Sequence, residues 1–111
     1  MNKKFRLKKT FEIEKLFKKR ISVGNAYFVM YYNLSSNEST RVAISVSKKL
    51  GNAVIRNREK RIIREIIRGK MDTIKGLDIL IVEKSKSLNL TFEEKKNEIS
   101  ILIKKMIRKG V

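Results

Sequence analysis

A run of lysine and arginine residues between positions 48 and 68 carries the clearest chemical signal in this sequence. On an α-helix, at 100° per residue, charged residues such as Arg56 and Arg64 separate from isoleucines such as Ile62 and Ile66. Guanidinium groups pair bidentately with phosphate oxygens. The pattern therefore predicts a helix that docks through its isoleucines and binds RNA or DNA through its basic side.

An ordinary amphipathic helix with a solvated basic side is the alternative explanation. Such a side usually mixes signs of charge, whereas this one contains no counter-charge of its own, so we favour nucleic-acid binding. Glu59 is an anomaly because its angle lies within the isoleucine side. We expect Glu59 either to sit near the helix start, where that side is still exposed, or to pair with a neighbouring cation.

The composition fits one basic domain spanning residues 1–111. The chain has 28 Lys and Arg against 11 Asp and Glu, a net charge of +17, spread from Lys3 to Lys109. A polyanion would relieve this self-repulsion; nucleic acid is the first candidate and a membrane surface the second. Cysteine and histidine are absent, which removes thiolate chemistry, the commonest general base and the commonest transition-metal ligand.

The hydropathy pattern predicts a soluble cytoplasmic protein that is not associated with a membrane. No segment approaches the roughly 20 apolar residues that a membrane span needs. The first residues lead into charged side chains and not into the apolar core of a signal peptide.

Periodicity and capping residues predict six elements in the order α-β-β-α-β-α. We expect a helix over 10–20, a turn over 22–25 and strands over 26–32 and 41–47. The basic helix over 52–69 follows, with Asn52 as its N-cap, and then a strand over 77–83 and a helix that begins with a capping box at Thr91. The first two strands should form an antiparallel hairpin, and the unit over 41–83 should place its strands parallel. The fold class is an α/β (α+β) two-layer sandwich. Its small mixed sheet has helices mainly on one face and displays Tyr27, Val29 and Tyr31 on the other.

The basic block and its flanks resemble the signature of the bacterial ribonuclease P protein subunit. The matching residues are Ser45-Val46-Ser47-Lys48-Lys49, Gly51-Asn52-Ala53-Val54 and Arg56-Asn57-Arg58-Glu59-Lys60-Arg61, continued by Arg64 and Arg68. The segments 6–9 and 28–31 also match in kind and order. The resemblance covers nearly the whole chain, and a block of this length with both flanks is specific.

The resemblance implies a fold and a division of labour beyond what the spacing shows. It implies a left-handed βαβ crossover, where general rules favour a right-handed one. The implied partner is the catalytic RNA of ribonuclease P, and the holoenzyme removes the 5′ leader from precursor tRNA. Catalysis is expected from Mg²⁺ bound by the RNA, with no cofactor bound by the protein itself and no obligate protein partner.

The resemblance also implies two binding surfaces. The RNA-binding residues are Lys48, Lys49, Asn52, Arg56, Asn57, Arg58, Lys60, Arg61, Arg64 and Arg68. The leader-binding cleft is lined by Ile13, Phe17, Val29 and Tyr31, whose apolar and aromatic surfaces suit unstacked bases. Core packing is the alternative for Phe17, Val29 and Tyr31. Ile13 and Glu59 depart from the family pattern, where an aromatic and an apolar residue respectively are common.

Other functions remain open from the residues alone. A ribosomal or other structural RNA-binding protein is the main alternative. A DNA-binding helix-turn-helix domain is disfavoured by the strands and by the lack of a helix just before the basic one. A free-standing nuclease would need clustered carboxylates to hold metal ions, but the acidic residues are scattered; the densest group, Glu93, Glu94 and Glu98, is typical of capping and helix pairing.

Overall fold

The computed structural model describes residues 21–35 and 39–109, so the helix predicted over 10–20 lies outside the described residues. Within these ranges the strands are β1 (Ser22–Gly24), β2 (Phe28–Leu34), β3 (Arg41–Val46) and β4 (Leu77–Glu83), and the helices are α2 (Ala53–Arg68) and α3 (Phe92–Arg108). Short 3₁₀ segments, η2 (Lys48–Leu50), η3 (Met71–Ile74) and η4 (Ser85–Asn89), join them. The predicted capping box at the start of α3 is confirmed: Thr91 Oγ1 accepts from Glu94 N, and Glu94 Oε1 accepts from Thr91 N.

The four strands form one mixed sheet in the order β1-β2-β4-β3. β4 pairs parallel with β3, as predicted for the strand–helix–strand unit. The predicted hairpin of β2 and β3 is wrong, because β4 lies between them and pairs antiparallel with β2. The segment predicted as a turn contains β1, which pairs antiparallel with β2.

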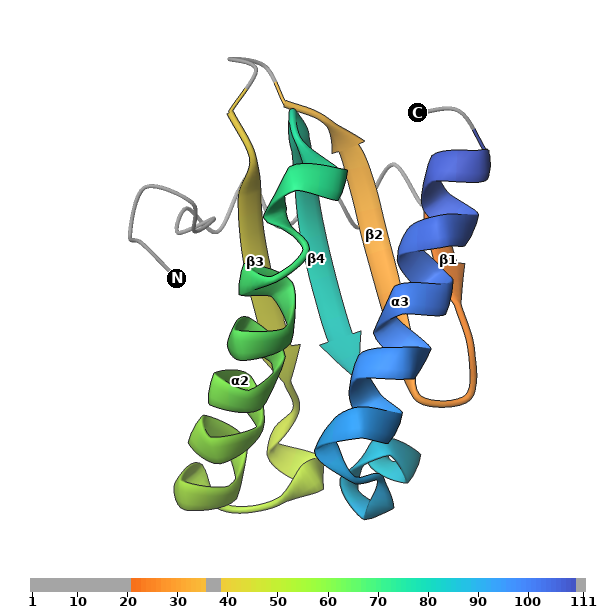
Figure 1. Ribbon diagram of the computed structural model, residues 1–111. Helices are drawn as coiled ribbons and strands as arrows, with labels where there is room; N and C mark the ends of the chain where they lie inside the picture. The colour runs from red at the N-terminus through yellow and green to blue at the C-terminus, as the bar shows by residue number, and fades with distance from the viewer. Residues whose placement is uncertain (1–20, 36–38, 110–111) are drawn as a thin grey trace.

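The crossover from β3 through α2 to β4 is left-handed. In Figure 1 both strands point downward, α2 lies in front of the sheet, and β4 is to the right of β3. When the strands are turned to point upward, β4 lies to the left of β3, which is the left-handed arrangement. The structure therefore has the handedness that the resemblance implied and not the one that general rules favour.

Both described helices cover the same face of the sheet (Figure 1). Alternate residues of β2, such as Phe28 and Met30, are fully buried against this helical layer because successive side chains of a strand point to opposite faces. Ile63 of α2 and Leu102 of α3 are fully buried in the same core. Neither of these two helices is long and apolar enough to cross a membrane.

The opposite face of the sheet carries a smaller apolar cluster. Leu80 of β4 is 1% exposed and is surrounded by Tyr31, Ala43 and Val82. The prediction that Tyr27 joins this face is wrong, because Tyr27 packs against the helix-side core. The Asn25 side chain accepts hydrogen bonds from the backbone N–H groups of Tyr27 and Phe28, so a turn, and not strand alternation, directs Tyr27.

Candidate nucleic-acid interface

The start of α2 depends on the glycine and asparagine before it. Gly51 has a φ of 155°, which residues with a Cβ rarely adopt, and a Cβ there would lie 2.9 Å from Ile55 Cδ1. Asn52 Oδ1 accepts a hydrogen bond from Ile55 N at 3.0 Å, which makes Asn52 the N-cap. Asn52 is exposed. Because its Oδ1 accepts the capping hydrogen bond, its side-chain NH₂ group is the part that can donate to a ligand.

Cations surround this N-terminal end of α2. Lys48 and Lys49 are exposed in η2, whose start is capped by Ser47 Oγ accepting from Lys49 N at 3.2 Å. Arg56 Nε donates to Gly51 O at 3.3 Å, which holds this half-buried side chain against the loop. The first turn of α2 contains no acidic residue, so the positive end of the helix dipole adds to these charges.

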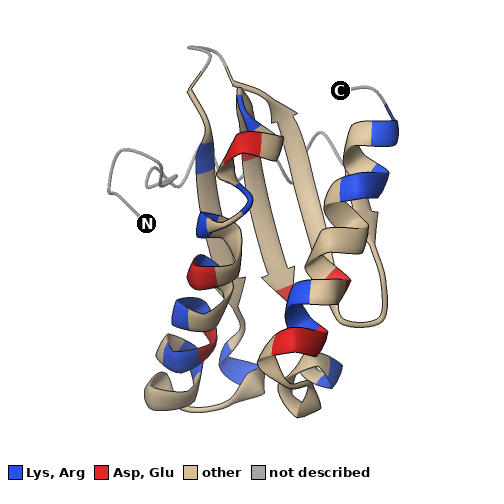
Figure 2. Ribbon diagram, viewed as in Figure 1, with Lys and Arg blue, Asp and Glu red and all other residues tan. Residues whose placement is uncertain are grey.

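The other predicted RNA-binding residues lie along the solvent side of α2. Exposed are Asn57, Arg58, Arg61 and Arg68; half-buried are Lys60 and Arg64. Figure 2 shows Lys and Arg gathered along this helix. Of the two acidic residues of α2, Glu59 is buried, and the exposed Glu65 offsets one cation of this set, Arg68, at 3.2 Å. The structure thus places the predicted set on one positively charged surface, which suits a polyanion.

Glu59 lies buried between α2 and α3. Lys95 of α3, itself buried, donates from Nζ to Glu59 Oε1 at 2.5 Å. Arg58 Nε lies 3.7 Å from the other Glu59 oxygen. Of the two expectations for Glu59, pairing with a cation is confirmed, and a still-exposed position near the helix start is wrong. The cation comes from another helix, 36 residues away in sequence.

A second buried carboxyl group, Glu83 at the end of β4, shares this site. Ser87 Oγ donates to Glu83 Oε2, and Oε1 has no hydrogen-bond donor among the described residues. Burial, together with the hydrogen bond to Glu59, raises the pKa of Glu83 to about 7. Burial would raise the pKa of Glu59 as well, but hydrogen bonds from Glu83 and Lys95 outweigh it, so that pKa is lowered.

These shifts define how protons and charges are arranged in the buried cluster. Glu59 is the ionised partner of Lys95, and Glu83 holds a proton up to about neutral pH. Glu83 Oε1, which has no hydrogen-bond partner among the described residues, is the oxygen left to carry this proton. The cluster joins α2, β4, η4 and α3, and so holds the basic helix against the rest of the fold.

The predicted leader-binding residues are only partly described. Val29 and Tyr31 are half-buried on the face of the sheet away from α2 and α3. Tyr31 stands opposite Leu80, and Val29 stands opposite Val82, so both belong to an apolar strip across β2 and β4. Ile13 and Phe17 lie outside the described residues, and the structure therefore does not show whether they meet this strip.

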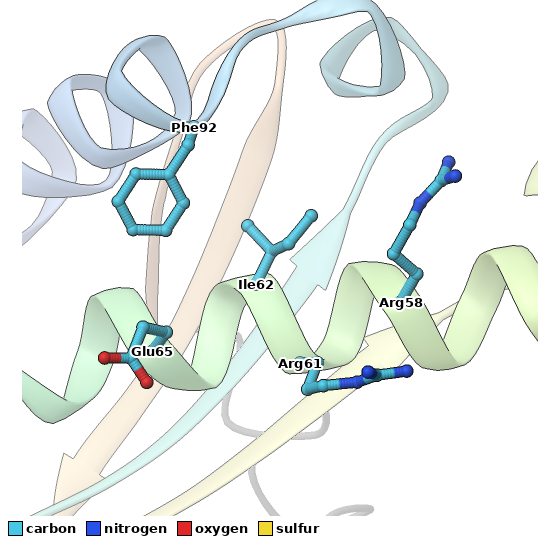
Figure 3. A pocket seen from close by; sticks show the side chains of 5 residues that line it. All are labelled: Arg58, Arg61, Ile62, Glu65 and Phe92. Carbon is cyan, nitrogen blue, oxygen red and sulfur yellow. The ribbon is translucent and has the colours of Figure 1, made fainter.

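The site residues predicted from the sequence omit one feature of the surface. A hollow of about 330 Å³ between α2 and the start of α3 is lined by Arg58, Arg61, Ile62, Glu65 and Phe92 (Figure 3). Phe92 follows the capping residue Thr91, and that position marks it as the first residue of a helix. The sequence offered no sign that this ring lies beside the basic side of α2.

Comparisons with known proteins agree with this geometry. The family model for ribonuclease P matches residues 1–107. A ribonuclease P protein component from Bacillus velezensis is 41% identical over 106 residues, covering 95% of this chain and 91% of that protein. The RNase P protein of Staphylococcus aureus superposes with a TM-score of 0.83 at 36% identity, covering 90% of this chain and 93% of the other. That of Thermotoga maritima gives 0.82 at 30%, covering 90% and 96%.

These relatives favour the resemblance over the alternative of a ribosomal or other structural RNA-binding protein. The matches extend over nearly the full length of both partners, and the solved structures share the arrangement of helices and mixed sheet. The chain belongs to the ribonuclease P protein family.

Proposed function

We propose that the chain binds the catalytic RNA of ribonuclease P through the solvent side of α2 and assists removal of the 5′ leader from precursor tRNA. The observation that carries this proposal is a docked helix on which three of the predicted cations, Arg58, Lys60 and Arg61, keep hydrogen-bond donors for a ligand. Among the described residues, Lys60 and Arg61 have no carboxylate within ion-pair distance, and Arg58 is only 3.7 Å from a Glu59 already paired with Lys95. These donors are available for phosphate oxygens.

We assign the cleavage chemistry to the RNA and its Mg²⁺. The chain contains no His and no Cys. The part of the chain that the structure describes brings together no three carboxylates that could hold a metal ion. The acidic pair Glu59 and Glu83 is buried and occupied by Lys95 and Ser87. The donor set of the described residues therefore does not fit Mg²⁺, and what they offer an RNA is charge and shape.

We place the leader on the face of the sheet away from α2 and α3. Tyr31 and Val29 lie on the apolar strip of that face, where a flat ring and a branched side chain suit single-stranded bases. α2 covers the opposite face, so the two surfaces would contact different parts of the substrate complex (Figure 1). Separate substitutions should therefore affect assembly and leader binding independently.

The salt dependence of RNA binding tests the assignment of α2. Arg61→Ala should weaken binding of the catalytic RNA and lower the slope of log K against log salt by about 1, because one phosphate contact and its released counterion are lost. Lys104→Ala, which removes the same charge from an exposed position on α3, is the matched control and should leave the slope unchanged. Equal slopes for the parent and Arg61→Ala would refute the assignment.

A further inference from the structure

The hollow beside α2 combines a flat ring with an apolar base and charged groups. Phe92 is 42% exposed at the first position of α3, and Ile62 is half-buried on α2. Figure 3 shows Phe92 reaching from α3 toward α2, where Ile62 and Glu65 lie across from the ring. Arg58 and Arg61 extend from the same helix on the far side of Ile62.

The guanidinium groups of the hollow are not taken up by the fold. The Arg58 side chain is 62% exposed, and the carboxylate nearest to it, Glu59, is held at 2.5 Å by Lys95. Arg61 is exposed, and no carboxylate of the described residues pairs with it. Glu65 pairs with Arg68 through Oε2 at 3.2 Å, and its side chain is 58% exposed, so the carboxylate stays accessible from solvent.

The size of the hollow matches a single planar group. A volume of about 330 Å³ is at the small end of ligand pockets, which range over roughly 300–1,000 Å³. A nucleobase is planar, has an edge with N–H donors or acceptors, and is attached to phosphates. These three properties match the Phe92 ring, the Glu65 carboxylate and the two arginines, and the positive charge of the surface favours a polyanion over a peptide.

We propose, on the basis of the RNA partner inferred above, that the hollow holds the base of one unpaired nucleotide of that RNA. The base lies against Phe92 and Ile62. Arg58 and Arg61 donate to the flanking phosphates, and Glu65 accepts from N–H groups on the base edge. α2 then binds at a point where the RNA is single-stranded, and the contact contributes site selectivity that phosphate pairing alone lacks.

Substitution of Phe92 separates this contact from the charge of the surface. The full chain is titrated with the catalytic RNA at several salt concentrations, and its thermal melt is recorded. Phe92→Ala should weaken binding by roughly 5- to 150-fold, the equivalent of about 1–3 kcal/mol for one stacked base, with an unchanged salt slope. Phe92→Trp keeps a flat ring and should bind like the parent. Ile101→Ala, an exposed apolar residue on the opposite side of α3, should have no effect.

Each outcome decides the proposal. A Phe92→Ala variant that melts and binds RNA like the parent would overturn the proposal. If Phe92→Ala melts at a lower temperature, Phe92→Leu decides, because it keeps apolar packing but has no flat ring. Its RNA binding is measured well below its melting temperature, where the chain is folded: a parent-like affinity overturns the proposal, and a weaker affinity supports it. If the parent chain does not bind the RNA, both the proposed function and the assignment of the hollow are refuted. If the parent binds and only the Phe92 variants contradict expectation, the proposed function stands.

Discussion

Replacing Glu83 with Gln should remove a pH dependence of stability that is built into the buried cluster. Glu83 is 2% exposed and has a pKa of about 7, against an ordinary value of 4.5. Glutamine has the same shape, its amide nitrogen can donate a hydrogen bond as a protonated carboxyl group can, and its oxygen can accept from Ser87. The variant should therefore keep the contacts of the protonated cluster and lack its ionisation.

The raised pKa sets the sign and the size of the effect. The folded state binds the proton of Glu83 more tightly than the unfolded state does. This contribution is fully present below pH 4.5 and is lost as pH rises through about 7. At about 1.4 kcal/mol per pKa unit, the loss over the shift from 4.5 to about 7 reaches at most about 3.5 kcal/mol. Glu59 acts in the opposite direction, because its lowered pKa contributes stability that is lost as pH falls below 4.5.

Urea unfolding at constant ionic strength between pH 4.5 and 8.5 measures the difference between variant and parent. Glu83→Gln should match the parent near pH 4.5 and become relatively more stable as pH rises, with the gain levelling off above pH 8. Glu93→Gln, which replaces an exposed carboxylate in the first turn of α3, is the control and should show no such growth. If the difference in the free energy of unfolding between Glu83→Gln and the parent stays constant across this range, the raised pKa of Glu83 is refuted.

Three further substitutions and one added anion test other parts of the structure. Lys95→Met leaves the buried Glu59 carboxylate unpaired and should lower the free energy of unfolding by about 3–5 kcal/mol in urea melts. Gly51→Ala forces a Cβ into a φ of 155° and should cost about 1–3 kcal/mol by the same measurement. Tyr31→Ala should weaken binding of precursor tRNA, but not of mature tRNA, by about 1–3 kcal/mol, with the melting temperature checked alongside. Sulfate at constant ionic strength should raise the melting temperature, because the net charge is +17.

The sheet order shows where local patterns stop being informative. The strands were predictable from β-branched and aromatic runs. The predicted pairing of β2 with β3 across the connection at 33–40 was wrong, because β4 lies between them. A signal was present: residues 79–82 form an unbroken run of branched aliphatic side chains, and a strand buried on both faces is expected to be central. The left-handed crossover had no local signal, and only the resemblance implied it.

Long-range pairs account for the other differences. The N-cap Asn52 and the capping box at Thr91 act within four residues, so the sequence predicted them correctly. Glu59 looked like a flaw in an apolar stripe because its partner, Lys95, belongs to another helix. Phe92 was missed for a similar reason, since its position beside Ile62 depends on how α3 packs near α2.

Cleavage of precursor tRNA is the most direct test of the proposal that the RNA performs the cleavage and this chain assists it by binding. The catalytic RNA, this chain and their mixture are each incubated with precursor tRNA over a series of Mg²⁺ concentrations. We expect no cleavage by the chain alone. We expect the mixture to cleave at lower Mg²⁺ and lower substrate concentration than the RNA alone, because the chain supplies positive charge and leader contacts. Cleavage by RNA-free protein that follows the protein through purification, or a mixture that behaves like the RNA alone, would contradict the proposal.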